Sequence, residues 1–87
     1  MDRKEAKTIL AKELGGYRKR LYKELLYLLK TQDVREVNGP SGKTYQLEFQ
    51  AVWDDCEGGN LRVIGAIDDG GLRAFIPMTD DFIITPD

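Results

Sequence analysis

The sequence contains no histidine and only one cysteine, Cys56, and these absences exclude several kinds of chemistry. Histidine is the side chain most used as a general base and as a metal ligand, so its absence removes many catalytic arrangements. A lone cysteine cannot form an internal disulfide, which favours the reducing cytoplasm as the location. We therefore predict a protein that is not an enzyme, with no cofactor and no metal site.

Long apolar segments are also missing. No apolar run approaches the ~20 residues that a helix needs to span a bilayer. The first residues are charged and no apolar stretch follows them, so neither a signal peptide nor a membrane partner is expected. The 87 residues, 41% hydrophobic and 32% charged, correspond to a folded chain of one domain. We expect a single α+β domain over residues 1–87.

The net charge of −2 conceals a strong segregation of charge along the chain. Residues 1–32 carry nine Lys and Arg against four acids, whereas residues 33–87 carry four against eleven. The two parts can attract each other within one molecule or between subunits, or they can bind separate partners.

Hydrophobic and polar side chains alternate along residues 44–54, and this stretch predicts the central element of the fold. One face of the alternation consists of Tyr45, Leu47, Phe49, Ala51 and Trp53. Alternation with a period of two is typical of a strand that has one buried and one exposed face. We therefore expect a long central strand.

The N-terminal third has apolar residues at helical spacing and predicts a helix over residues 3–31. The stripe consists of Leu10, Leu14, Tyr17, Leu21, Leu25 and Leu28. It keeps its phase through Gly15 and Gly16, although each glycine costs about 1 kcal/mol relative to alanine inside a helix. One helix with a kink at the glycine pair is expected, and a split into two helices there is the alternative. Residues 17–30 form the firmer part of this prediction.

Turn residues divide residues 34–85 into a four- to five-stranded antiparallel β-meander, with the helix packed on one face. Gly39-Pro40-Ser41-Gly42 predicts the first turn. Asp69-Gly70 predicts a two-residue hairpin of type I′. The expected strands are residues 34–38, 44–54, 60–68, 72–76 and 82–85.

The turns also predict a register for the sheet. Pairing Asp54 with Asn60 places Phe49 opposite Gly65, where the ring can cover the bare backbone. The second hairpin would place Ile67 beside Leu72. The face away from the helix then carries a partly apolar patch, which is typical of a partner surface. This candidate protein-interaction face consists of Val52, Ile64, Ala66 and Phe75.

A basic cluster on the predicted helix is a second candidate surface. It consists of Arg18, Lys19, Arg20 and Lys23, which could follow a phosphate backbone. Because the chain as a whole is acidic, nucleic acid is the less favoured partner.

Three further motifs resemble functional sites and are better explained by local structure. The stretch from Gly39 to Thr44 resembles part of a phosphate-binding loop, but a strand follows it where such a loop needs a helix. The acidic pairs at residues 54–55, 68–69 and 80–81 fall at strand ends and turns, where Asp is common. Cys56 lies among acidic residues, which do not favour a reactive thiolate.

These observations favour a small non-enzymatic interaction or regulatory module that forms a homodimer, or binds a protein partner, through the exposed sheet face. One alternative is a small-molecule binding protein or enzyme with a pocket between helix and sheet. Another is a nucleic-acid binder that uses the basic helix.

Overall fold

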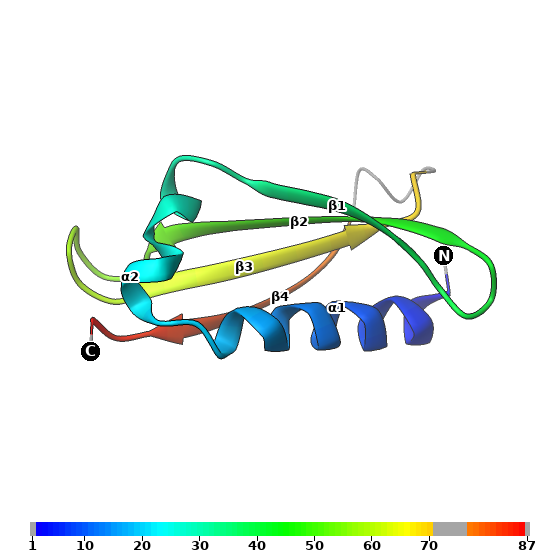
Figure 1. Cartoon of the computed structure of the whole chain (residues 1–87), viewed down its shortest axis with the longest axis horizontal. Coiled ribbons are helices and arrows are strands. Elements are labelled where there is room, and N and C mark those ends of the chain that lie inside the picture. The colour runs from blue at the N-terminus through cyan, green and yellow to red at the C-terminus, as the bar shows by residue number, and fades with distance from the viewer. Residues whose placement is uncertain (1, 71–76, 87) are drawn as a thin grey trace.

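The computed structural model describes residues 2–70 and 77–86, and it places a helical layer on one face of a four-stranded antiparallel sheet (Figure 1). The sheet has the strand order β1-β2-β3-β4. The elements are α1 (Arg3–Arg18), α2 (Tyr22–Leu25), the 3₁₀ helix η1 (Leu26–Leu29), β1 (Asp33–Asn38), β2 (Thr44–Trp53), β3 (Leu61–Asp68) and β4 (Met78–Ile84). The predicted α+β class, with an N-terminal helix on an antiparallel meander, is confirmed.

Helix α1 is continuous from Arg3 to Arg18. Asp2 caps its start, because the Asp2 carboxylate accepts a hydrogen bond of 3.0 Å from the backbone N–H of Glu5. The helix passes through Gly15 and Gly16 without interruption, so the predicted kink or split at this pair is wrong. Its buried face consists of Ala6, Leu10, Leu14 and Tyr17.

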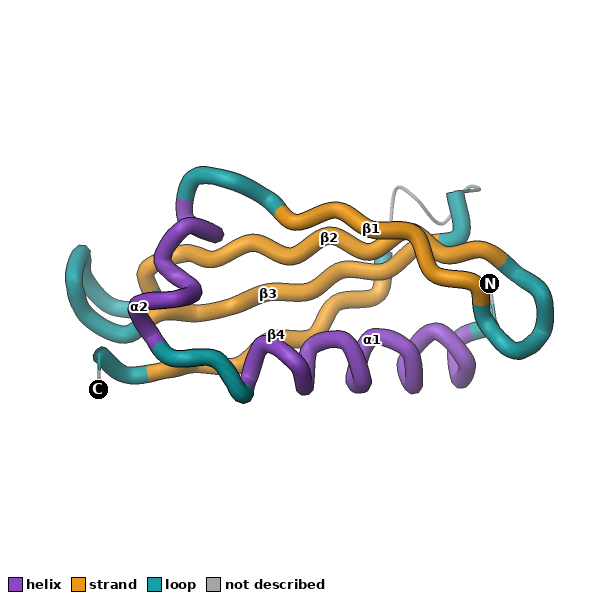
Figure 2. Tube along the Cα trace, viewed as in Figure 1, coloured by secondary structure: helices purple, strands orange, loops and turns teal. Residues whose placement is uncertain are grey.

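The helical segment breaks instead after Arg18, inside residues 17–30, the firmer part of the helix prediction. Leu21 has an extended backbone and a 60% exposed side chain, although it belongs to the apolar stripe. The Glu24 carboxylate accepts a hydrogen bond of 2.8 Å from the Leu21 N–H, which starts a new helical turn. The break redirects the chain so that Leu25 and Leu28 are buried in the core, with η1 over β2 (Figure 2).

The central strand has the predicted alternation, and β2 pairs with β3 in the predicted register. Phe49 lies opposite Gly65, and Trp53 lies opposite Leu61. A Cβ added to Gly65 would lie only 2.9 Å from Cε1 of Phe49, so the ring occupies the space that the glycine leaves. Phe49, on the core face of β2, therefore packs closely against the backbone of β3.

The pairing on the other side of β3 differs from the prediction. Strand β3 pairs with β4, and Ile67 lies opposite Met78. The predicted strand at 72–76 lies outside the described residues. A type I′ turn needs positive φ at both central residues, but only Gly70 has it, at 80°. The Asp68 carboxylate instead accepts a hydrogen bond of 2.8 Å from the Gly70 N–H, which closes an Asx turn.

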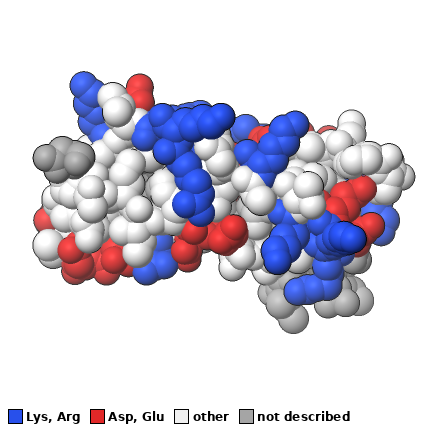
Figure 3. Space-filling model, turned by 90° about the horizontal axis from the view of Figure 1, so that it is seen from below, with Lys and Arg blue, Asp and Glu red and all other residues white. Residues whose placement is uncertain are grey.

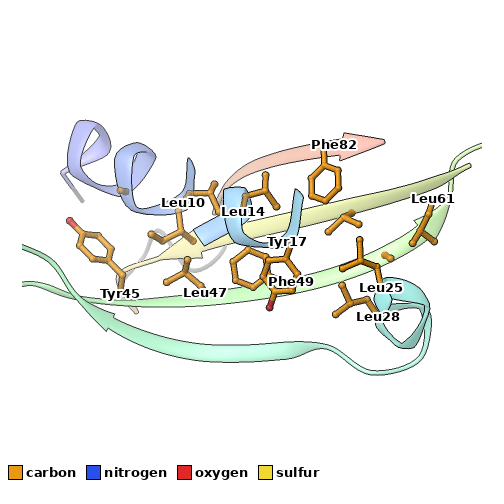
Figure 4. Close-up of a cluster of buried hydrophobic side chains, with 14 residues drawn as sticks. Leu10, Leu14, Tyr17, Leu25, Leu28, Tyr45, Leu47, Phe49, Leu61 and Phe82 are labelled. Carbon is orange, nitrogen blue, oxygen red and sulfur yellow. The ribbon is translucent and has the colours of Figure 1, made fainter. Parts of the chain in front are cut away.

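The hydrophobic core lies between the helical layer and one face of the sheet (Figure 4). Tyr17 and Phe49 stack at its centre, with ring centroids 4.5 Å apart. Phe82 of β4 reaches the same core from the far edge of the sheet, and Leu25 and Leu28 reach it from the second helical segment. One face of the sheet is thus covered by residues from both ends of the chain.

Candidate functional site

A groove of about 730 Å³ lies between α1 and β1. Helix α1 packs on β3 and β4 and leaves the N-terminal half of its other flank facing the edge strand β1. Ile9 of α1 and Val37 of β1 provide apolar walls, and both also pack against the core. The turn at Gly39-Pro40 closes the groove near the N-terminus of the helix.

The groove adjoins backbone groups of β1 that have no partner among the described strands. The Gly39 N–H donates a hydrogen bond of 2.8 Å to the Lys43 carbonyl. In an antiparallel ladder, hydrogen-bonded and non-hydrogen-bonded residue pairs alternate. Counting back along the register from Gly39, the N–H and C=O groups of Val34, Glu36 and Asn38 point to the open edge of β1. Asn38 also lines the groove.

A three-residue hairpin loop fixes one end of the groove. The Gly42 N–H donates to the Gly39 carbonyl at 2.9 Å, and Gly42 has a φ of 90°, as expected for a type I turn followed by a left-handed residue. Glu5 of α1 ties this loop to the helix, because its carboxylate accepts hydrogen bonds from the Ser41 N–H and hydroxyl and from the Tyr45 hydroxyl.

These hydrogen bonds shift the pKa of both ionisable partners. The Ser41 hydroxyl, followed by the Tyr45 hydroxyl, lowers the pKa of Glu5 below its ordinary value. Burial and the bond to Glu5 raise the pKa of Tyr45 to about 12. Glu5 is therefore a carboxylate and Tyr45 a neutral hydroxyl at neutral pH, and the end of the groove has a fixed pattern of charge.

A second polar cluster closes the opposite end. The Arg35 guanidinium forms an ion pair of 2.8 Å with Glu13 and donates a bond of 2.8 Å to the Tyr17 hydroxyl. The Tyr17 and Tyr27 hydroxyls both donate to the same oxygen of Asp33, Oδ2, at 2.6 and 2.5 Å. This cluster joins both helical segments to β1.

Ionisation in the second cluster is set by competing effects. Burial pushes the pKa of Asp33 upward, but the two tyrosine hydroxyls and two nearby arginines outweigh it and leave the pKa below 3.8. Burial, followed by the hydrogen bond to Asp33, raises the pKa of Tyr17 well above 10. The hydroxyl thus stays protonated as a donor, and no buried side-chain N or O atom among the described residues lacks a partner.

The carboxylates of the groove are held by their own neighbours, whereas its lysines are not. Asp2 caps α1, Glu5 binds the hairpin loop and Glu13 binds Arg35. Lys4 and Lys12 are exposed, line the same wall and make no ion pair with any residue that the structure describes. Asp2 and Glu5 accept hydrogen bonds from neutral groups and keep their negative charge, so the lining of the groove carries charges of both signs.

The face of the sheet away from α1 contains three of the residues predicted to bind a partner. Val52 is 42% exposed, while Ile64 and Ala66 are half-buried on the same face. Phe75 lies outside the described residues, and the position beside Ile64 that it was expected to occupy belongs to Asp81. The predicted row of Ile64 and Phe75 therefore lies partly outside the described residues.

An arginine divides this exposed face. Arg62 lies between Val52 and Ile83 in the register. Its guanidinium forms ion pairs of 2.6 Å with Asp54 and 3.1 Å with Asp81. The apolar residues are consequently separated by a charged row and do not form one continuous patch.

The basic cluster lies at the helix break, and two of its members have structural contacts. The Arg18 guanidinium lies 4.8 Å from the centre of the Phe82 ring, and that of Arg20 lies 4.5 Å from the Tyr17 ring. Lys19 and Lys23 are exposed. Lys and Arg are spread over the side of the molecule that α1 forms, with Asp and Glu mainly along the lower margin (Figure 3).

The other sequence motifs have local structural roles. The stretch from Gly39 leads into β2 and not into a helix, so it is a hairpin loop, as predicted. The pairs at residues 54–55 and 68–69 lie at opposite ends of β3. Cys56 is exposed. In the ranges 2–70 and 77–86, no three acidic or thiol side chains cluster closely enough to hold a metal ion.

The sequence offered a pocket between helix and sheet as an alternative, but it did not identify the residues that line this groove. Glu5 and Ser41 are separated by 36 residues, and no local pattern connects them. The edge position of β1 was the available signal, since the first strand of a meander has a neighbour on one side only.

Comparisons of the chain with models of protein families, with curated proteins and with solved structures gave no significant match. The helices of the described residues are too short and too polar to cross a bilayer.

Proposed function

We propose that this protein is a non-enzymatic interaction module of the cytoplasm that binds an extended segment of a partner protein along β1. The observation that carries the proposal is the open edge of β1 beside the groove. A bound segment would form backbone hydrogen bonds with Val34, Glu36 and Asn38, while its alternate side chains enter the groove. Strand addition of this kind obtains affinity from the backbone and specificity from the side-chain pockets.

The shape and chemistry of the groove favour an extended peptide over a small molecule. The volume of about 730 Å³ falls in the range of ligand sites, but one side of the groove is a strand edge. Its polar side chains at both ends already have intramolecular partners. The backbone groups along the edge of β1 have no partner among the described strands, and a peptide satisfies such groups along its whole length.

The same contacts support a role in binding and not in catalysis. The Tyr17 hydroxyl, the most buried ionisable group of the second cluster, has a raised pKa and donates to Asp33. A general base needs a pKa near the working pH and a free lone pair directed at substrate. Asp33 instead accepts hydrogen bonds from two tyrosines, so the cluster serves to hold β1 in place.

A proline at Glu36 tests the proposal. The N–H of Glu36 points away from β2, so proline is compatible with the strand there and removes the central donor of the open edge. With a synthetic peptide of about nine residues that has valine at its centre and threonine elsewhere, wild type should show amide NMR shifts along β1. Glu36→Pro should lose binding by about tenfold or more.

Glu36→Ala is the matched control, because it removes the same side chain and keeps the N–H. It should bind the peptide like wild type, and circular dichroism should show both variants folded. Equal binding by Glu36→Pro and Glu36→Ala would contradict strand addition, as would an absence of shifts in wild type at millimolar peptide.

Self-association through the outer sheet face is the second candidate function. Val34, Val52 and Ile83 all lie on this face with exposures of 62%, 42% and 47%. Exposed hydrophobic residues on one face favour a contact between copies. Glu48 and Asp68 also lie on it, however, and a two-fold contact would bring like charges together, so we place this candidate second.

A further inference from the structure

The open edge of β1 has a side-chain sequence that complements itself when two copies run in opposite directions. We propose that the extended segment bound along β1 is β1 of a second copy of this protein, paired antiparallel about a two-fold axis at Val34. This inference rests on the proposed function, because it names the partner of the same strand edge. The two four-stranded sheets would then form one eight-stranded sheet, with both helical layers on the same side.

The backbone of β1 restricts how two copies can pair. The strand lies at the margin of the sheet (Figure 2). Its outward N–H and C=O groups belong to Val34, Glu36 and Asn38, at alternate positions. In an antiparallel ladder, residues with outward groups pair only with one another. A two-fold axis therefore passes through one residue of β1 and its own copy, and that residue defines the register.

Charge excludes three of the possible axes. Directly paired residues lie side by side on the same face of the sheet. An axis at Asp33, Arg35 or Glu36 would place each of these charges opposite its own copy. Like charges directly opposite each other are destabilising in a ladder, so these three registers are disfavoured.

The hairpin loop after β1 excludes two more. An axis at Val37 places Pro40 of each copy opposite Val34 of the other, and an axis at Asn38 places Pro40 opposite Glu36. Proline has no N–H, so it cannot donate to the carbonyl of the residue it faces. Since β1 consists of residues 33–38, Val34 is the remaining residue through which the axis can pass.

An axis at Val34 places opposite charges together on the helical face of the sheet. Asp33 lies opposite Arg35 of the second copy, and Arg35 lies opposite its Asp33. Opposite-charge pairs in these positions stabilise a ladder. The Arg35 side chain is 41% exposed, and its guanidinium has five donors, so it can keep its bonds to Glu13 and Tyr17.

The outer face of the same register is also complementary. Val34 is 62% exposed, the highest exposure among the large apolar side chains that the structure describes. At the axis, the two valine side chains cover each other and leave water. Gln32, which bonds the Gln50 side chain at 2.9 Å, lies opposite Glu36 of the second copy. Its amide can donate to that carboxylate.

Cysteine substitutions test the position of the axis, in a Cys56→Ser background that removes the exposed native thiol. Under mild oxidation Val34→Cys should form a covalent dimer, because residues in a hydrogen-bonded pair have Cα atoms about 5.5 Å apart, within the range of a disulfide. Glu36→Cys is the matched control on the same face. Its two copies would be separated by about 13 Å along the strands, so it should stay monomeric. Equal cross-linking of the two variants would overturn the inference.

Sedimentation equilibrium at several concentrations tests the contact without a cross-link. Wild type should be a dimer. Val34→Lys, which places like charges on the axis, and Glu36→Pro, which removes an outward donor from each copy, should each weaken the dimer by about tenfold or more. Val52→Lys is the matched control, because Val52 is exposed on the same face of β2, away from the edge. It should dimerise like wild type, and circular dichroism should show each variant folded.

The outcomes also separate this inference from the function on which it rests. If wild type is monomeric but the valine–threonine peptide binds it and not Glu36→Pro, the second copy is the wrong partner and strand addition stands. If wild type is monomeric and no peptide binds, strand addition itself fails. If Val52→Lys dissociates the dimer and Glu36→Pro does not, the copies meet through the outer sheet face and the inference is overturned.

Discussion

Asp33 is a single residue on which several elements depend. Its Oδ2 atom accepts hydrogen bonds from Tyr17 in α1 and Tyr27 in η1, while its own backbone begins β1. Arg35, two residues further along the same strand, contacts the Tyr17 hydroxyl from the other side. The start of the edge strand is therefore fixed by side-chain hydrogen bonds, in addition to its ladder with β2.

Replacing Asp33 by asparagine should give a stability difference that depends on pH. The pKa of Asp33 is lower in the folded protein than its ordinary 3.8. A carboxyl group whose pKa is lower in the folded protein stabilises the fold at pH values above its pKa in the unfolded chain. This contribution is lost as the pH falls through the pKa of the folded protein. Urea unfolding should show Asp33→Asn less stable than wild type by about 1–2 kcal/mol at pH 7. The gap should close as the pH falls below the ordinary pKa of 3.8.

Tyr17→Phe provides the control for this measurement. It removes one donor to Asp33, so Asp33→Asn should cost less in the Tyr17→Phe background than in wild type. A gap between wild type and Asp33→Asn that is the same at acid and neutral pH would show that the carboxylate charge does not contribute.

At the scale of the element, α1 contains two glycines that its own packing does not require. A Cβ added to Gly15 or Gly16 would meet nothing within 4 Å, and both have helical backbone angles. Gly15→Ala and Gly16→Ala should each stabilise the protein by up to about 1 kcal/mol, because alanine loses less backbone entropy in a helix. Thermal unfolding followed by circular dichroism measures the change.

Gly42→Ala is the contrasting variant. Gly42 also has open space, but its φ of 90° is strained for any residue with a Cβ. Gly42→Ala should therefore lower the free energy of unfolding by about 1 kcal/mol or more. A loss of stability at Gly15 or Gly16 as large as that at Gly42 would contradict an unstrained, uncrowded helix.

The elements that the sequence predicted correctly are those whose signal is local and strong. The alternation around Phe49 and the Asp54–Asn60 connection are enough to predict β2, β3 and their register. The helix break was missed because Leu21 keeps the phase of the stripe. The chain changes direction there, and the change places Leu25 and Leu28 in the core. The predicted strand at 82–85 coincides only with the end of β4, which begins at Met78. The turn after β3 was also wrong in type, because Asp69-Gly70 matches a hairpin signal whereas the Asp68 side chain closes an Asx turn.

The groove could not be predicted in the same way, because it is a tertiary feature. Its walls come from α1 and β1, and its ends depend on contacts between residues far apart in sequence, such as Glu5 with Ser41. The predicted interaction face was partly correct in position, since Val52, Ile64 and Ala66 share the face away from α1. Its division by Arg62 depends on the position of Asp81 in β4, which the predicted register did not contain.

At the scale of the whole molecule, the uncovered sheet face gives a prediction about assembly. If two copies meet through this face, Ile64→Lys should yield a folded monomer, because it places like charges at the centre of the contact. Light scattering of wild type and variant at the same high concentration measures this. Glu57→Gln, in the exposed loop between β2 and β3, changes the net charge by the same one unit; it is the charge-matched control and should leave the mass unchanged. A monomeric wild type would rule out the dimer.

The packing of α1 on β4 joins the first and the last described elements of the chain. Arg18 contacts the Asp81 carbonyl across 63 residues of sequence and covers the ring of Phe82. On the ribosome, α1 is therefore synthesised long before β4, the last strand against which its apolar face packs. Contacts at such sequence separation slow folding, because the intervening loop must close first. We therefore expect part of the apolar face of α1 to remain uncovered until β4 has been synthesised.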